Sequence, residues 1–384
     1  MWVLKKLLGI MLCVLGTFSL NAMERANDEA VNKLLIGTLS GDAAKQSFRE
    51  FRSSIKSQKN YYEVYSRFID KLGVKRISNY LEAEDASCHG IAHALGKVIA
   101  ERVGDLNQSM QLCGSTCTYA CVHGVFKQYF SELGKNYHTH EGESHHAMHD
   151  SQPVTLTKSE LNKFGETVNA TCAQSKTTVD DFFRGNCAHA VGHAMAKLAM
   201  DVGLANDYCR VFDSSAMKYY CETGVFMELG SQIKQKIFQS GMRRSEEISV
   251  AIKYCSIQSN YPSACFRFLL PRHKSLGHVT RHATLCSRET DALQQHCFNA
   301  LGYMARTYVA KNPDEINYVC VLAQGESKQA CYSGLAFMKK GQRYRQAMFK
   351  ACGLLVNSSE RRYCQQQAGE FYYDLANKGF EKLL

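Results

Sequence analysis

The sequence predicts an all-α protein: a disulfide-stapled α/α solenoid of about eight helix-pair units with an N-terminal helical cap. Three observations lead to this prediction. Apolar residues recur at helical spacing, segments that begin with a cysteine recur about every 33 or 34 residues, and only four prolines occur in 384 residues. A repeat of this length is typical of a helix-turn-helix unit, and helical periodicity without β alternation disfavours strands.

The first stretch, MWVLKKLLGIMLCVLGTFSLNA, has the pattern of a cleaved secretory signal. Lys5 and Lys6 precede an apolar run, and a small residue, Ala22, ends it. We therefore expect residues 1–22 to be a signal peptide and the mature protein to be periplasmic or secreted. No later segment reaches eighteen uninterrupted apolar residues, so no membrane span is expected.

Residues 23–86 carry no cysteine and predict an N-terminal cap of three or four helices, because terminal repeats must shield an exposed apolar face. Helical spacing is clear there in AVNKLLIGTL and YYEVYSRFIDKLG. Histidine-bearing repeats are expected over residues 87–260, with a histidine-rich insertion at 135–154. Residues 261–384 are expected to form C-terminal repeats and a terminal helix.

Sixteen of the seventeen cysteines follow the signal, an even number that indicates a disulfide framework in an exported chain. Each unit begins at one cysteine, and a second cysteine lies 8 to 15 residues before the next unit. Closing a loop of that size stabilises by about 3 kcal/mol in the chain-entropy model. The expected bridges are Cys172 with Cys187, Cys209 with Cys221, Cys255 with Cys265, Cys286 with Cys297, Cys320 with Cys331 and Cys352 with Cys364.

Four further cysteines lie in the first two units: Cys88, Cys113, Cys117 and Cys121. The repeat pattern pairs Cys113 with Cys121 and leaves Cys88 for Cys117. The sequence alone permits three pairings of four cysteines, so this assignment stays open.

The insertion KNYHTHEGESHHAMHDSQPV has almost nothing to bury and predicts a surface loop. Its five histidines are His138, His140, His145, His146 and His149. Histidine-rich tracts bind transition metals without fixed geometry, so the loop is either a solvated spacer or a metal-capturing segment or lid. It is not the helical H-E-x-x-H of metalloproteases, because the spacing is wrong and Gly142 interrupts a helix.

Several classes of function are disfavoured. The formal charge is +10, and the basic residues are interleaved with acids, which indicates attraction to acidic surfaces in general and not a nucleic-acid groove. The sequence has no P-loop and no G-x-S-x-G elbow. A free catalytic cysteine is not expected when all sixteen have partners.

In six of the units one position is polar and is followed by a small residue. It lies two residues after the unit cysteine, and a one-residue slip places His89 there in the first unit. In the later units it holds His123, His189, Thr223, Asn299 and Ser333. Because histidine occupies it only in the first three units, we expect a specialised site there.

Two His-x-x-x-His pairs, His89 with His93 and His189 with His193, each lie on one helical face. Such a pair can place two imidazoles on one metal ion. With His123 on the helix between them, these five histidines are the predicted ligands of at least one transition metal: iron, zinc or copper. The alternative is that they cap helices or fill polar gaps.

Three other residues are candidates for catalysis in a metalloenzyme, although the sequence does not decide whether the protein is an enzyme. Glu222 could act as ligand or base. Lys97 and Lys197 continue the two histidine faces and could position an anionic substrate, or could simply be solvated.

The cysteine pair at each junction, the small residues after it and the period together resemble the disulfide-stapled Sel1-like and TPR-like repeat proteins of bacteria. The resemblance covers roughly residues 88–384, although the alanine and glycine pattern of Sel1 units is incomplete. It implies a surface that binds a peptide or protein. The sequence therefore supports two hypotheses. The first is an exported metal-binding repeat protein, of which a His-coordinated metalloenzyme is one form, and the second is a non-catalytic scaffold.

Overall fold

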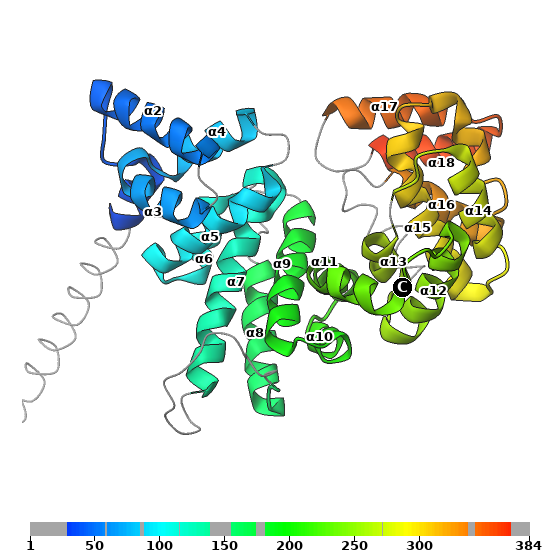
Figure 1. Ribbon diagram of the computed structural model, residues 1–384, viewed down its shortest axis with the longest axis horizontal. Coiled ribbons are helices and arrows are strands. Elements are labelled where there is room, and N and C mark those ends of the chain that lie inside the picture. The colour runs from blue at the N-terminus through cyan, green and yellow to red at the C-terminus, as the bar shows by residue number, and fades with distance from the viewer. Residues whose placement is uncertain are drawn as a thin grey trace, which may run out of the picture. The chain divides into compact units, whose positions relative to one another are not determined.

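The computed structural model describes most of the chain, and every regular element in the described part is a helix (Figure 1). The described residues are 29–57, 60–84, 88–114, 116–138, 155–173, 181–270, 272–336 and 342–369. The predicted signal peptide and nearly all of the histidine-rich insertion lie outside these ranges. The all-α class is confirmed.

The chain divides into two compact units, Met1–Val125 and Phe126–Leu384, with the boundary inside one long helix. The predicted divisions at residues 86 and 260 remain predictions. Beyond a short helix at 29–36, the elements of the first unit are α2 (Gly41–Ser57), α3 (Tyr61–Leu72), α4 (Val74–Glu84), α5 (His89–Val103), α6 (Leu106–Cys113) and the first part of α7 (Thr116–His138).

The first unit forms helices where the sequence supplies caps and an apolar face. Asn60 accepts a hydrogen bond from the N–H of Glu63 at the start of α3, and Asp105 does the same for Gln108 at the start of α6. Phe51 is fully buried on the apolar face of α2. Its ring packs on aromatic rings of α3 and α4, so these three helices share one core.

The second unit is a further series of helices. It contains α8 (Lys158–Ala173), α9 (Asp181–Ala199), α10 (Val202–Cys209), α11 (Ser215–Ile237), α12 (Arg244–Gln258), α13 (Pro262–Leu269), α14 (Leu276–Cys286), α15 (Asp291–Val309), η2 (Pro313–Tyr318), α16 (Gly325–Ala336), α17 (Gln342–Gly353) and α18 (Ser358–Gly369). Asp201, Ser214 and Ser275 cap the N-termini of α10, α11 and α14. Helices α9, α11, α13, α15, α16 and α18 contact one another in chain order.

Eight disulfides join the sixteen cysteines, and every expected pair is confirmed, including Cys88 with Cys117 and Cys113 with Cys121. In α9, α11, α15, α16 and α18 the second cysteine of the bridge lies about two turns inside the helix, not at its start. Each bridge therefore ties the preceding segment to the middle of the next helix.

Three helix pairs share one close contact, α5 with α7, α9 with α11 and α15 with α16. In each pair a glycine on either helix faces a backbone carbonyl of the other. A Cβ atom on these glycines would lie only 1.8 to 2.0 Å from that oxygen. The glycines are Gly96 and Gly124, Gly192 and Gly224, and Gly302 and Gly334. No other residue permits this approach, so the small residues of the repeat set the spacing of the paired helices.

Candidate metal centre

The glycine contact between α5 and α7 determines where the first group of histidines lies. A Cβ on Gly96 would meet the carbonyl oxygen of Cys121, and one on Gly124 would meet that of His93. Since His93 precedes Gly96 by three residues and His123 precedes Gly124 by one, the two imidazoles lie at the point of closest approach. His89 lies one turn before His93 on the same face of α5.

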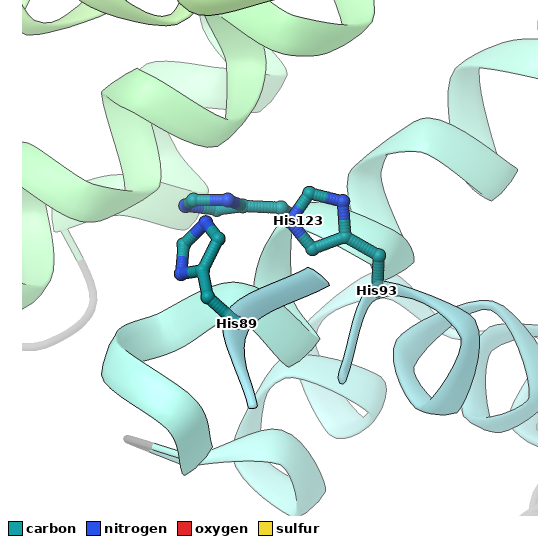
Figure 2. A group of neighbouring side chains, drawn as sticks. All are labelled: His89, His93 and His123. Carbon is teal, nitrogen blue, oxygen red and sulfur yellow. The ribbon is translucent and has the colours of Figure 1, made fainter. Parts of the chain in front are cut away.

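The three imidazoles of His89, His93 and His123 form a compact triad in the first unit (Figure 2). Their ring centroids are 5.1 to 5.3 Å apart, and the rings are steeply inclined to one another. One nitrogen from each ring lies within 4.8 Å of the other two. His123 is buried, and the other two are half-buried.

The triad fits a tetrahedral transition metal. Nitrogens at ~2.0–2.1 Å from such an ion stand ~3.3 Å from one another, and small rotations of imidazoles within 4.8 Å reach that spacing. Three neutral imidazoles would leave a fourth position open, as catalytic zinc sites do. Zinc, copper and iron all accept imidazole.

A backbone carbonyl orients one member of the triad. Nδ1 of His89 lies 3.3 Å from the carbonyl oxygen of Cys117, so it carries the proton and donates it. Nε2 then holds the lone pair that binds a metal. The Cys88–Cys117 disulfide joins the residue before His89 to the residue that accepts its hydrogen bond. The backbone N–H of Cys117 in turn donates to Glu82.

The second unit contains the pair His189 and His193 on α9. Nδ1 of His189 lies 2.6 Å from Oγ1 of Thr223, whose hydroxyl donates to the carbonyl of Tyr220. Nδ1 of His189 is therefore the donor in the first bond. Nδ1 of His193 donates to Glu228 at 2.7 Å. In the neutral form of each ring the lone pair is therefore on Nε2, and the two Nε2 atoms are 3.2 Å apart.

This spacing is close to the ~3.3 Å expected for two nitrogens on one tetrahedral ion. Burial lowers the pKa of His193, although its hydrogen bond to Glu228 opposes the shift. The imidazole is therefore neutral near pH 7, the form that binds metals.

Glu228 connects His193 to two lysines. Its carboxylate lies 2.7 Å from Lys127 Nζ and 3.8 Å from Lys197 Nζ. Burial alone would raise the pKa of Glu228, but hydrogen bonds from His193 and Lys127 outweigh it and hold the pKa well below its usual value. Burial also lowers the pKa of Lys127, against the pull of Glu228. The carboxylate stays ionised and fixes the orientation of His193.

The glycine contacts correct the repeat alignment inferred from the sequence. Gly96 and Gly192 occupy the same place in their helix pairs, which makes His93 the equivalent of His189. The sequence comparison instead matched His89 with His189, one helical turn away. The two histidine pairs are therefore not on matching positions. The triad lies in the first unit and the pair in the second.

The three candidate catalytic residues lie outside the triad. The carboxylate of Glu222 is buried and accepts hydrogen bonds from Ser259 and Asn260 after α12. Burial raises its pKa, and these hydrogen bonds oppose the shift. Lys97 is half-exposed beside Glu101 and Tyr62, and Lys197 is exposed beside Glu228. Their catalytic roles stay predictions.

Sequence reasoning missed Lys127 and Glu228. A usable signal existed, because Lys127 follows His123 by four residues and Glu228 follows Gly224 by four, so each shares a helical face with a residue of the repeat. It also missed a third group of potential ligands on α14 and α15 that contains His282. There the signal was His282 one turn before Cys286.

Comparison with protein-family models, with curated proteins and with solved structures finds no match to this chain. In the described part of the chain, no helix has the length and apolar character needed to cross a membrane. The likeness to Sel1-like and TPR-like repeats stays a prediction from the sequence.

Proposed function

We propose that the protein is an exported, metal-binding helical-repeat protein that holds a transition-metal ion on His89, His93 and His123. The observation that carries the proposal is the convergence of three imidazoles, one nitrogen from each lying within 4.8 Å of the others. The two Nε2 lone pairs of His189 and His193 offer a further place for a cation in the second unit.

The arrangement supports a site that exchanges ligands. Three histidines leave an open coordination position for water, a substrate or a side chain of a partner, whereas structural zinc sites use four protein ligands. The hydrogen bond from His89 to the Cys117 carbonyl is the kind of outer contact that orients metal-binding imidazoles. The metal is zinc, copper or iron, and a metalloenzyme is one use of such a site.

The proposed protein is exported and is built as a solenoid of helical repeats. Eight disulfides are typical of an oxidising compartment. Helices α9, α11, α13, α15, α16 and α18 contact one another in chain order, which supports a solenoid of about eight units. Terminal units and the insertion at 135–154 then flank the metal-binding ones.

The competing proposal is a non-catalytic scaffold whose groove binds a peptide or protein. The observation that favours it is that the pair α15 and α16 has the same glycine contact without histidine, using Asn299 and Ser333 in place of His93 and His123. The polar position of the repeat thus has a structural role that needs no metal.

That substitution pattern supplies the test. The double variant His93→Asn, His123→Ser places in the first unit the residues that α15 and α16 already accommodate. We expect the wild type, purified without a metal-affinity column, to retain about one ion per chain under chelator competition. The variant should retain none at the triad, with its disulfides and helical circular dichroism unchanged.

Retention is measured by elemental analysis after dialysis against a chelator. Wild-type protein that holds no more metal than the variant would overturn the metal proposal in favour of the scaffold. A His193→Gln variant, which leaves the triad complete, separates the second-unit pair from the triad.

A further inference from the structure

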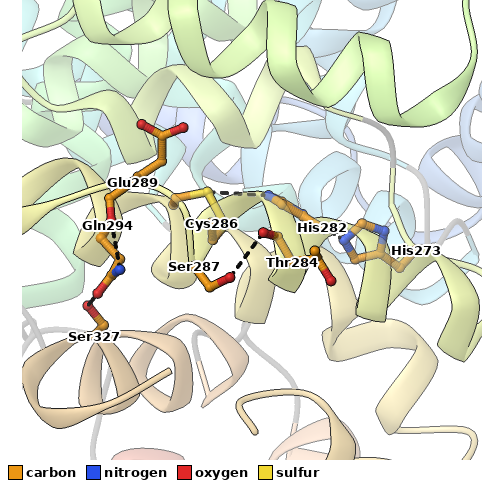
Figure 3. Close-up of a disulfide and its surroundings, with 9 residues drawn as sticks. His273, His282, Thr284, Cys286, Ser287, Glu289, Gln294 and Ser327 are labelled. Atoms are coloured by element: carbon orange, nitrogen blue, oxygen red, sulfur yellow. Dashed lines mark hydrogen bonds between the residues drawn. A yellow bond between two sulfur atoms is a disulfide. The ribbon is translucent and has the colours of Figure 1, made fainter. Parts of the chain in front are cut away.

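A buried pair of histidines abuts one of the eight disulfides (Figure 3). Nε2 of His273 lies 2.9 Å from Nδ1 of His282, and Nε2 of His282 lies 3.9 Å from Sγ of Cys297. These side chains and Cys286 are at most 3% exposed. The chain of contacts therefore runs from one imidazole through the second to the sulfur atoms.

Three elements hold this group. His282 and Cys286 lie one turn apart on α14, and Cys297 lies on α15. The backbone N–H of His273, in the segment before α14, donates to the Met304 carbonyl of α15. The group is thus fixed on both sides of the α14–α15 junction, inside the second unit.

The oxidised protein gives no structural reason for the histidine pair. Nδ1 of His273 is buried and has no hydrogen-bond partner among the described residues, which is unfavourable. Burial lowers the pKa of His273 to about 3 and that of His282 well below its usual range, so both rings are neutral. An apolar pair would pack there at lower cost.

Among the described residues, this group of potential ligands is the one that contains cysteine: His282 Nε2, Cys286 Sγ and Cys297 Sγ lie within 4.8 Å of one another. The bridge Cys320–Cys331 has the same sequence separation of 11 residues and belongs to no such group. The histidines therefore distinguish one staple from another of equal length.

We infer that reduction of the Cys286–Cys297 disulfide creates a buried Cys2His site for a thiophilic divalent metal such as zinc. The inference does not depend on the triad of the first unit. His282 binds through Nε2 and is oriented by His273, as metal-binding imidazoles are oriented by an outer partner. Two thiolates, one imidazole and an open position make up a known class of zinc site.

The charges suit a buried position. Two thiolates neutralise a divalent ion, so the loaded site carries no net charge, whereas a lone thiolate or an imidazolium would be penalised by burial. Cys286 is the last residue of α14 and is followed by the exposed Ser287. The site therefore lies one residue along the chain from an exposed position.

A thiol reductant can open the Cys286–Cys297 disulfide. A dithiol donates two electrons and two protons to the Cys286–Cys297 bond, which gives two thiols and the cyclic disulfide of the reductant. Metal binding then releases the two thiol protons to solvent. Exchange with a disulfide oxidant, which takes up the two electrons and becomes two thiols, restores the Cys286–Cys297 bond and expels the ion, so occupancy depends on the thiol–disulfide balance.

The test uses cobalt(II) as the probe, because thiolate ligation gives a sulfur-to-cobalt charge-transfer band that histidine ligation does not give. The full-length protein is reduced in steps with a phosphine and titrated with cobalt(II). We expect the band to appear only after reduction, and His282→Gln to lower the affinity by at least about tenfold. Alkylation mapped by mass spectrometry should show metal-dependent protection of Cys286 and Cys297.

A second pair of variants removes the need for a reductant. Cys286→Ser leaves Cys297 as a thiol beside His282, and Cys320→Ser leaves Cys331 as a thiol in the matched staple. We expect a thiolate–cobalt band from the first variant and none from the second. Equal bands, or no band, from the two variants would overturn the inference. Equal alkylation of Cys286 and Cys297 with and without metal in the reduced wild type would also overturn it.

Discussion

The helix pairs α5/α7 and α15/α16 share one backbone contact and differ in the polar side chains placed at it. In both, two glycines bring each helix against a carbonyl of its partner. The first pair puts His93 and His123 at this junction with His89 beside them, and the second puts Asn299 and Ser333 there. The comparison shows that the repeat requires the glycines for packing and any suitable polar residue beside them.

The polar residues in the two pairs have different hydrogen-bonding roles. Asn299 donates to the Ala330 carbonyl and accepts from Arg267, and Ser333 bonds with Tyr363 and Gln367. These hydrogen bonds link α15 to α13 and α16, and link α16 to α18. In α5/α7 three imidazoles converge on one another instead, an arrangement that a cation could stabilise. The two helix pairs therefore share the glycine packing and differ in the chemistry of the polar side chains beside it.

The largest effect is expected from the shared glycines. Gly302→Ala would place a Cβ 2.0 Å from the Cys331 carbonyl oxygen, so the helices must separate, at a cost of about 3 kcal/mol in the free energy of unfolding. Gly96→Ala should cost a similar amount and also weaken metal binding by the triad. Urea unfolding with the disulfides intact measures the loss of stability in both variants.

The matched control for these substitutions is Gly277→Ala on α14, where a Cβ meets nothing within 4 Å. It should stabilise by up to about 1 kcal/mol. If Gly302→Ala behaved like Gly277→Ala, the close contact would not set the helix spacing.

Next in size is removal of the carboxylate beside His193. Glu228→Gln leaves the half-buried Lys127 without its carboxylate at 2.7 Å, and we expect a loss of about 2 kcal/mol in the free energy of unfolding. The exposed pair of Lys45 and Asp42 provides the control, since Asp42→Asn should give no measurable change. If Glu228→Gln and Asp42→Asn changed the free energy of unfolding equally, burial of the Glu228 ion pairs would not contribute to stability.

A histidine near α15/α16 should respond to pH without binding metal. His296 is buried beside Ser263 on α13, and burial lowers its pKa to about 4. The unfolded chain therefore binds more protons below pH 6.5, so the stability is complete above that pH and falls as the pH falls. From pH 6.5 to 5 the loss is about 2 kcal/mol.

The measurement for His296 is the pH dependence of unfolding in the wild type and in His296→Gln. The variant should have a shallower slope in this range, and added metal should not change the difference. An unchanged slope would show that His296 can be protonated in the folded protein at little cost.

The smallest effect is expected at Lys97. It is half-exposed and lies 3.9 Å from Glu101, so Lys97→Ala should change the free energy of unfolding by at most about 0.5 kcal/mol. Metal retention by the triad should be the same as in the wild type. A large drop in retention would instead support the role for Lys97 expected from the sequence.

Much of the fold could be predicted because its signals are local in sequence. The helical spacing of apolar residues and the spacing of the cysteines both act over a few turns of chain. The repeat pattern favoured the pairing of Cys88 with Cys117 but left two other pairings open, and the structure decides between them. The positions of cysteines two turns inside the long helices could not be predicted, because helix starts depend on caps that the cysteine spacing does not reveal.

The site was predicted in part. His89, His93 and His123 were identified from their spacing, and the structure brings them together. The match of His89 with His189 was wrong by one turn, because the alignment followed the cysteines. In the structure the equivalent positions of the two helices are Gly96 and Gly192. Contacts such as His193 with Glu228 join residues 35 positions apart, and no local pattern encodes them.

The connectivity of the staples has a consequence for oxidative maturation. Seven of the bridges link cysteines 8 to 15 residues apart, whereas Cys88 and Cys117 are 29 apart and enclose Cys113, whose partner Cys121 lies beyond them. Oxidation in order of emergence would join Cys88 to Cys113 first, and only thiol–disulfide exchange corrects that error. Because Cys117 holds the ring of His89, we expect the metal-binding triad to be the last part of the molecule to mature, and to depend on a disulfide isomerase.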